Sequence, residues 1–308
     1  MSLPEKLIIM YHSVSSPTIP EVVGSFPIPM ARFQYQVQSA MALGYTVSPI
    51  TELLQPNTPG QRQLFITGDD GTVDWTRNVL PWCEANKLPS HTAIIAGPWL
   101  AQPIYPLAHL IQVILSVRSE TELEQLAKQL QSAISPEALS YLQKVYAYES
   151  TEARRIIKGA CNLILEPEQA YEIIGECSQQ EQLCLAQRFE VPSFYQALQF
   201  ADVGVHTVSH KAMGKNIEDY CSAEIDTAKK LLLKHGLKPS SVFTLPMKPR
   251  WGVSVDDLIP PLTERGYQGI LYSEYALWNQ HDFVVPRIDA KHVEDVLNIP
   301  SFAEAIWA

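Results

Sequence analysis

The chain has 308 residues, 46% of them hydrophobic and 18% charged, and its formal net charge is −10. This length and composition can fill a sizeable hydrophobic core, in one large α/β domain or in two smaller ones. The acidic balance argues against nucleic acid as a partner, and no segment approaches the roughly 18 apolar residues that a membrane span needs.

The first residues predict a buried strand rather than a targeting segment. The apolar run LIIM at 7–10 follows an acidic residue, Glu5, and is too short for the core of a signal peptide. We therefore expect a cytoplasmic protein.

Strands and helices alternate over the first hundred residues. Apolar runs without polar alternation predict strands covered on both faces, and apolar positions at helical spacing predict the helices between them. Strands are expected at 6–12, 44–50, 62–67 and 90–96, and helices at 30–45 and 72–87, with Pro81 bending or ending the second helix. This alternation is typical of βα units around a mainly parallel sheet.

From about residue 103 to residue 200 the pattern is helical. Helices that begin at proline, serine, threonine or glutamate are predicted at 106–117, 120–134, 136–150, 151–165 and 167–177. We interpret 103–200 as a large helical insertion, a subdomain or a lid, within a single catalytic domain that spans 1–308.

The βα alternation resumes in the last third of the chain. Strands are expected around 201–210 and at 241–246, 267–273 and 282–290, and helices at 222–236, 254–266 and 301–308. With about seven strands in all, the pattern predicts an α/β fold of the TIM-like barrel type, complete or incomplete, in which chemistry lies at the C-terminal ends of the strands.

Two aspartates, Asp69 and Asp70, directly follow the third predicted strand, with Gly68 and Gly71 on either side. Adjacent carboxylates repel each other, and a metal ion would relieve this: one aspartate could bind the ion while its neighbour takes a proton from water. The glycines would leave room for a tight backbone and a close ligand. The alternative is a turn in which Asp70 or Thr72 caps the following helix.

Two histidines, His206 and His210, follow the first strand after the helical segment. A spacing of four on a helix, or on a strand end that enters one, can bring two imidazoles to one side. Two imidazoles and a carboxylate are a common ligand set for a divalent metal with open positions. A chance pair on a solvated face is the alternative, but the position of both motifs at C-terminal strand ends favours a shared metal site.

These two motifs resemble those of a known family. Residues 67–71 read TGDDG and residues 206–210 read HTVSH, close to the T-F-D-D-G and H-[ST]-x-x-H motifs of the polysaccharide deacetylases, the NodB homology domain of carbohydrate esterases. The resemblance extends to 8–14, 26–54 and 236–271, about two-thirds of the chain, and leaves 103–200 outside. It implies a distorted (β/α) barrel and metal-dependent removal of an N-acetyl or O-acetyl group from a carbohydrate substrate.

The resemblance also implies roles for the motif residues. Asp69 takes the position of the catalytic base, and Asp70, His206 and His210 take the positions of the metal ligands, with zinc the most frequent metal. Water held by the metal and Asp69 would attack the acetyl carbonyl, and the metal would stabilise the oxyanion.

The third family motif, R-x-P-[YW]-G, has an arginine that orients the base. The nearest stretch here is KPRWG at 248–252, with Lys248 at the arginine position and Arg250 two residues on. Either is a candidate for the catalytic role, unless no residue replaces the arginine or both lie in a solvated loop. Trp251 is a candidate for stacking on a sugar ring, with packing as the alternative.

The fifth family motif, L-x-H, supplies the general acid, but the matching strand reads LYS at 271–273 and has no histidine. His281, Glu274 or Tyr272 could replace it, and Tyr272 is also a candidate for substrate contact. His12, at the end of the first strand, is a candidate for substrate contact or a hydrogen-bonded strand-end histidine.

Arg287 is expected at the rim of the barrel. It could contact substrate, pair with one of the aspartates or be structural. His91, His109, His235 and His292 have no evident partners in the sequence and are assigned no role.

We therefore predict a metal-dependent deacetylase, with zinc the favoured metal, that hydrolyses the acetyl amide or ester of an N-acetylated sugar or polysaccharide. A catalytically impaired relative that binds a glycan or a partner, and a hydrolase of a non-sugar amide, are the alternatives. A non-haem iron oxygenase also uses two histidines and a carboxylate, but the ligand order and the βα alternation disfavour it. The oligomeric state stays open.

Overall fold

The structure is a computed structural model that describes residues 3–19, 27–58, 60–250, 252–274, 276, 278 and 282–306. Two candidate site residues, Trp251 and His281, lie outside the described residues.

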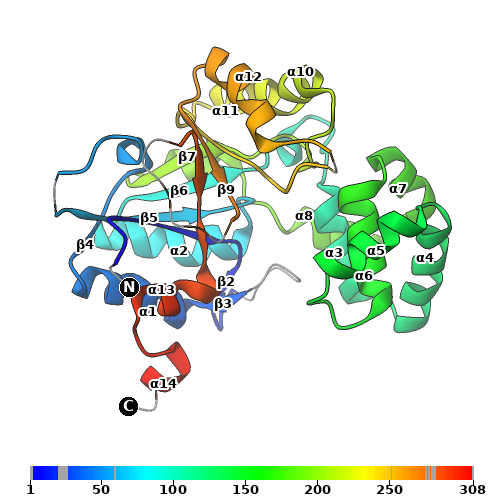
Figure 1. Ribbon diagram of the computed structural model, residues 1–308, viewed down its shortest axis with the longest axis horizontal. Helices are drawn as coiled ribbons and strands as arrows, with labels where there is room; N and C mark the ends of the chain where they lie inside the picture. The colour runs from blue at the N-terminus through cyan, green and yellow to red at the C-terminus, as the bar shows by residue number, and fades with distance from the viewer. Residues whose placement is uncertain are drawn as a thin grey trace.

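A parallel sheet lies in the left-hand part of the molecule as drawn in Figure 1. Its strands run in the order β11-β1-β5-β6-β7, and β4 pairs with the first residues of β5. β1 is buried along its whole length, as expected for an apolar run without polar alternation. The strands are β1 (Lys6–Tyr11), β4 (Tyr45–Val47), β5 (Arg62–Gly68), β6 (Ser90–Ile94), β7 (Ala201–Val205) and β11 (Ile288–Asp289).

A second parallel sheet, ordered β10-β9-β8, closes the barrel. It consists of β8 (Val242–Thr244), β9 (Gly269–Tyr272) and β10 (Val284–Pro286). Only Arg287 separates β10, which pairs with β9, from β11, which pairs with β1. On the other side, Val203 of β7 pairs with Pro239 just before β8. The two sheets form a distorted (β/α) barrel, so the predicted α/β fold class is confirmed. A separate pair, β2 (Val14–Ser15) and β3 (Ile28–Pro29), lies beside it.

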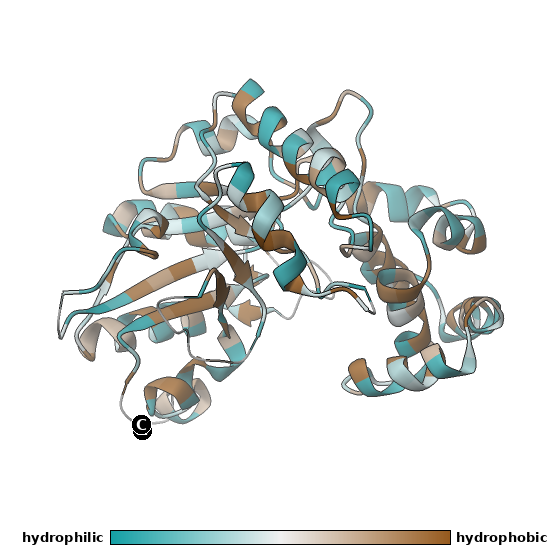
Figure 2. Cartoon of the chain, turned by 45° about the horizontal axis from the view of Figure 1, so that its top comes forward, coloured by the Kyte–Doolittle hydropathy of each residue, from teal (hydrophilic) through white to brown (hydrophobic). Residues whose placement is uncertain are grey.

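Helices surround the barrel, and hydrophobic residues run along its central strands (Figure 2). The helices are α1 (Met30–Ala42), α2 (Val73–Asn86), α10 (Ile217–Tyr220), α11 (Thr227–Lys234), α12 (Ile259–Glu264), α13 (Val293–Leu297) and α14 (Phe302–Ile306). Trp75, Val79 and Cys83 recur every four residues on α2 and are all buried in the core, which is the pattern of a one-sided amphipathic helix. This helix continues through Pro81, so the expectation that Pro81 could end it is wrong.

The helix expected at 222–236 begins earlier than predicted. A π-helical segment, η4 (Cys221–Asp226), joins α10 to α11, so the helical stretch starts at Ile217. The side chain of Asn216 accepts a hydrogen bond from the backbone N–H of Asp219 and caps this start.

Residues 107–186 form a group of helices beside the barrel, here called the helical block (Figure 1). It comprises α3 (Leu107–Val117), α4 (Glu120–Ser132), α5 (Pro136–Val145), α6 (Glu152–Gly159), η3 (Ala160–Ile164), α7 (Pro167–Ile174) and α8 (Gln179–Ala186), and α9 (Pro192–Gln196) follows it. The block has an apolar cluster of its own, centred on residues such as Ile111, Leu130 and Ile157. Its five predicted helices are confirmed, and the reading of 103–200 as an insertion in one domain stays a prediction. No helix among the described residues is long and apolar enough to span a membrane.

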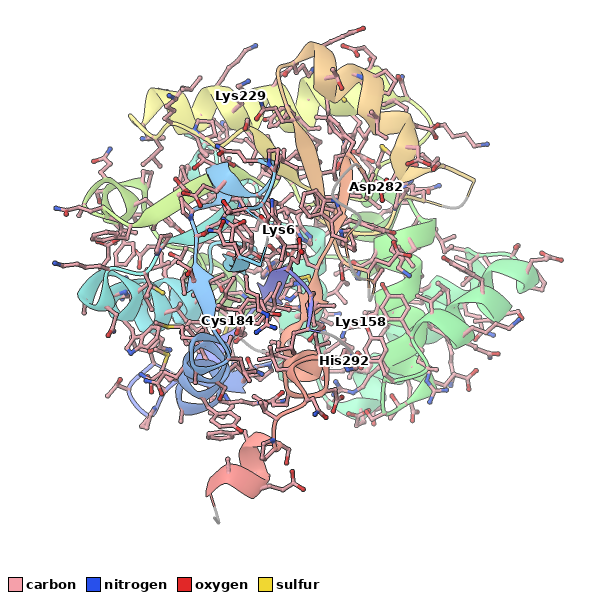
Figure 3. All side chains as sticks on the ribbon, turned by 60° about the vertical axis from the view of Figure 1, so that its left-hand side comes forward. Lys6, Lys158, Cys184, Lys229, Asp282 and His292 are labelled. Atoms are coloured by element: carbon pink, nitrogen blue, oxygen red, sulfur yellow. The ribbon has the colours of Figure 1, made fainter. Side chains whose placement is uncertain are left out.

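A buried lysine, Lys6, lies at the amino-terminal end of β1 and is labelled in Figure 3. It donates hydrogen bonds to the backbone carbonyls of Leu53 and Gln55. Burial lowers its pKa from the ordinary value. Because β1 and β5 run parallel, the aspartate pair lies at the opposite end of the strands from this lysine.

Candidate active site

The aspartate pair lies where β5 leaves the barrel. Gly68 ends the strand, and Asp70 and Gly71 both have a positive φ of 69°, so the chain turns sharply into α2. Both aspartates are buried, with 2% of Asp69 and 5% of Asp70 exposed. At this depth, two adjacent charges need separate partners.

Position 68 needs a glycine because a neighbouring side chain leaves no room for a Cβ atom, and not because its backbone conformation requires one. A Cβ atom on this residue would lie 2.0 Å from the indole ring of Trp75. Trp75 is fully buried, donates from Nε1 to the Thr92 hydroxyl at 2.9 Å and stacks on Tyr11. The indole therefore fills the space beside position 68, which the family motif gives to a phenylalanine.

Replacing Gly68 by alanine should destabilise the protein by about 1–3 kcal/mol, because the added methyl group overpacks a rigid aromatic cluster. Urea unfolding monitored by tryptophan fluorescence measures this change. The control is Ser132→Ala, on the exposed surface of α4. Gly236 is also exposed, but its positive φ would make a substitution by alanine strained. A Gly68→Ala variant as stable as the wild type would contradict this role of Trp75.

Asp70 meets the two predicted histidines. Its Oδ1 lies 3.3 Å from Nε2 of His206 and 3.2 Å from Nε2 of His210. One ligand atom from each residue falls within 4.8 Å of the others, which is the spacing of a shared metal site. Burial disfavours the charge on Asp70, but the surrounding histidines hold the pKa of this carboxyl well below its usual range.

A turn, rather than a helix, brings the two histidines together. His206 follows β7, and the chain then adopts positive φ values of 69° at Thr207 and 57° at His210. Glu224 stabilises the turn by accepting hydrogen bonds from the backbone N–H groups of Val208 and Ser209 at 3.0 and 2.8 Å. The spacing of four was therefore informative. Of the two geometries considered, the helix is wrong, and His206 directly follows a strand end.

The tautomer of His206 shows that the three residues suit a cation. Its Nδ1 lies 2.9 Å from the backbone carbonyl of Thr244, so this nitrogen carries the proton and Nε2 presents a lone pair. That lone pair faces Oδ1 of Asp70, a buried oxygen with no hydrogen-bond partner among the described residues. A proton on Nε2 or a bound cation relieves the repulsion between these two acceptors. Burial lowers the pKa of His206, but Asp70 and Asp69 outweigh burial and raise it. A divalent metal would take the place of the Nε2 proton, so the donor set fits a metal.

Asp69 has a different partner. Both of its oxygens accept hydrogen bonds from Arg287, each at 2.7 Å, and the arginine also donates to the Thr67 hydroxyl at 3.1 Å. Arg287 is 1% exposed, so this is a buried, two-pronged ion pair. Burial raises the pKa of Asp69, but Arg287 outweighs it and keeps the pKa below its ordinary value. Asp69 is therefore an ionised carboxylate of fixed orientation beside the proposed metal.

Solved structures share this architecture. The deacetylase PplD of Streptococcus pyogenes, determined in complex with acetate, matches 96% of this chain and 99% of its own, with a TM-score of 0.52 and 13% sequence identity. IcaB from Ammonifex degensii matches 96% of each chain, with a TM-score of 0.54 and 14% identity. The chain has the fold of the polysaccharide deacetylases. No family model and no curated protein match the sequence.

Within this deacetylase fold, the residues considered for orienting the base lie elsewhere. Arg250 pairs with Glu166 of the helical block and donates to the backbone carbonyl of Leu165 at 3.2 Å. Lys248 is exposed. The structure thus places Arg287 on Asp69, and neither Lys248 nor Arg250 is found there. Arg287 was expected at the rim, with substrate contact, an ion pair to an aspartate or a structural role as alternatives, and its burial against Asp69 favours the ion pair.

The remaining candidates lie around the carboxylates. His12 is partly exposed, with Nε2 3.9 Å from Oδ2 of Asp69, which is compatible with substrate contact. Tyr272 is half-buried at the end of β9, and its backbone carbonyl accepts a hydrogen bond from the N–H of Arg287 at 3.0 Å. Trp251 and His281 are outside the described residues, so their roles stay predictions.

A third histidine, which sequence reasoning missed, contacts the site. His109 on α3 places its Nε2 3.2 Å from Oδ2 of Asp70, and only 1% of the residue is exposed. Burial lowers its pKa to about 4, so the imidazole is neutral. The signal available in the sequence was a single histidine in an otherwise apolar helical run at 107–111.

A cavity of about 260 Å³ opens beside His210, between the barrel and the helical block. The barrel side contributes His210, Lys211 and Arg250, and the block contributes residues such as Leu107 and Tyr171. The helical block therefore forms one wall of the space next to the candidate metal ligands.

Proposed function

We propose that the protein is a metal-dependent deacetylase that hydrolyses the acetyl amide or ester of an N-acetylated sugar. The observation that carries the proposal is the division of the aspartate pair. Asp70 faces two imidazoles in a geometry suited to a cation, while Asp69 is held ionised by Arg287. A metal ligand next to a separate base is the arrangement that metal-assisted hydrolysis needs.

Asp70, His206 and His210 would hold the divalent cation, with zinc the best match to two imidazoles and one carboxylate. When bound, such an ion polarises the acyl oxygen and lowers the pKa of water. Asp69 would accept the proton from the attacking water, and Arg287 would fix the direction of its oxygens. Burial of all these groups strengthens their electrostatic effect on the reaction.

Protonation of the leaving amine is assigned to a residue at the end of β9 or in the segment after it. The strand ends in Leu271-Tyr272 and is followed by Ser273, so it lacks the histidine of the family motif. His281 remains our candidate for the proton donor, with Tyr272 and Glu274 as alternatives.

A catalytically impaired protein that binds a glycan is the second candidate function. The missing histidine after Leu271 favours it. The buried pair of Asp69 and Arg287 argues against it, because binding alone does not require an oriented base.

Metal removal tests the proposal. Purified protein should contain about one equivalent of a divalent metal and release acetate from N-acetylglucosamine oligomers or small acetylated amides. Treatment with a chelator should reduce acetate release to background, and added zinc should restore it. Full metal content with no acetate from any substrate would favour the binding function, and turnover that survives complete metal removal would contradict the deacetylase proposal.

A further inference from the structure

We propose that His109 positions the Asp70 carboxylate, and that the helical block is thereby a structural part of the metal centre. The inference rests on the metal site proposed above and adds to it a residue from outside the barrel. It predicts that metal affinity depends on α3, and that bound metal in turn stabilises the docking of α3.

The two oxygens of Asp70 have different partners. Oδ1 faces His206 and His210, whereas Oδ2 faces Nε2 of His109 at 3.2 Å. The cluster of converging ligand atoms comprises Asp70, His206 and His210 and does not include His109 among the described residues. His109 therefore lies on the other side of the Asp70 carboxylate from His206 and His210. It donates a hydrogen bond to Oδ2, whereas the other two imidazoles face Oδ1.

Packing fixes the His109 ring in this position. Its centroid lies 5.0 Å from that of Phe189 and 6.0 Å from that of His210. Nδ1 of His109 has no hydrogen-bond partner among the described residues, whereas Nε2 lies 3.2 Å from Oδ2 of Asp70, so the ring donates from Nε2. Donation there restrains rotation of the carboxylate and keeps Oδ1 directed at the two other histidines.

The segment that returns from the helical block holds α3 against the aspartate loop. Arg188, which is buried, donates to the backbone carbonyl of His109 at 3.0 Å and to the side chain of Gln112 at 2.7 Å. The backbone carbonyl of Arg188 accepts from the N–H of Val73 at 2.8 Å, and Phe189 pairs with Thr72 in an antiparallel bridge. Thr72 and Val73, which follow Asp70, are thus paired with the segment 188–189, and Arg188 of this segment holds His109 in place.

Hydrogen bonds to a ligating carboxylate commonly contribute about 10–100-fold to metal affinity. Linkage requires the reverse effect as well, since a metal that binds more tightly when α3 is docked must also favour the docked state. The structure thereby connects occupation of the metal site to order in the helical block.

Zinc affinity of the full-length protein, measured by competition with a chromophoric chelator, tests this inference. His109→Leu removes the donor but suits the apolar helix, and we expect it to weaken zinc binding by about 10–100-fold. His109→Gln retains an N–H donor at a similar reach and should recover most of the affinity. His235→Gln, a half-buried histidine that contacts Trp99, is the matched control and should bind zinc like the wild type.

Hydrogen exchange of the wild type provides a readout that does not depend on any variant folding. Adding zinc should slow exchange of α3 amides, and His109→Leu should lose this protection. This inference is wrong if the wild type binds zinc but its α3 amides show no protection, or if His109→Leu binds zinc as tightly as the wild type. Either result would leave the proposed metal site unaffected. If the wild type binds no divalent metal, the proposed metal centre is wrong, and the inference about His109, which depends on it, is wrong as well.

Discussion

Asp69→Asn is expected to lower acetate release by about 10²–10⁴-fold, the usual contribution of a general base. An amide cannot accept the proton that the ionised carboxylate takes, although it has nearly the same shape. Zinc affinity should change little, because Asp69 is not among the converging ligand atoms. Steady-state acetate release and metal content, measured on the same preparations, separate the two effects.

Asp295→Asn is the control for this substitution, because Asp295 is an exposed carboxylate on α13. It should leave both turnover and metal content at the wild-type level. An Asp69→Asn variant that binds zinc and turns over normally would show that another group serves as the base. A variant that loses zinc would place Asp69 among the ligands instead.

Arg287→Met should lower the free energy of unfolding by about 3–5 kcal/mol, because it leaves the Asp69 carboxylate buried without its partner. Methionine keeps the length and much of the volume of the side chain, so the lost charge dominates. Urea unfolding in the presence of a chelator measures the change without a contribution from metal. The free energy of unfolding of Arg287→Lys should lie between those of the wild type and Arg287→Met. Lysine restores the positive charge but not the two parallel hydrogen bonds.

An exposed ion pair supplies the comparison. Arg154 and Glu120 lie 3.2 Å apart at the surface of the helical block. Because Arg154 also donates to the backbone carbonyl of Leu115, the substitution is made on the exposed partner, and Glu120→Gln should cost less than about 1 kcal/mol. Equal losses at the two sites would mean that burial of the Asp69 pair has no energetic consequence.

The pH dependence identifies the charge as the cause. In the wild type, burial raises the pKa of Asp69 but Arg287 lowers it further, so the pair contributes its full stability at neutral pH and loses it as the pH falls through this lowered pKa. In Arg287→Met, the strongest lowering influence is lost and burial is opposed only by His206 and His12, so we expect the pKa of Asp69 to rise above its ordinary value of about 4. The stability difference between the two proteins should therefore shrink as the pH falls from 7 toward about 4. A constant difference over this range would indicate lost packing instead.

The sequence predicted the part of the site that depends on which residues directly follow a strand. Asp69 and Asp70 directly follow one strand and His206 directly follows another, and parallel strands bring their C-terminal ends to the same face of a barrel. Strand type and motif position were therefore enough to expect that these residues would meet. The same reasoning assigned the correct class of fold.

Contacts between distant segments could not be decided by this reasoning, which left the pairing of Arg287 with an aspartate as one of three alternatives and gave His109 no role. Arg287 reaches Asp69 across 218 residues, and its position depends on a strand that changes partner between two sheets. His109 enters the site because the helical block docks on the loop after Asp70, and helical periodicity cannot reveal where a helix docks. Gly68 was interpreted through backbone freedom, because the sequence does not show that Trp75 folds back over it.

The way in which the barrel closes has a consequence for the order of events during synthesis. The strand segment from Val284 to Asp289 joins the two sheets, and Arg287 lies at the single step between them. A ribosome makes Asp69 long before it makes this segment, so a nascent chain that stops before Val284 holds every proposed metal ligand but lacks the guanidinium that pairs with Asp69. The proposed site is thus completed only after Arg287 has emerged, and a chain that stops before this segment would lack the partner of its proposed base.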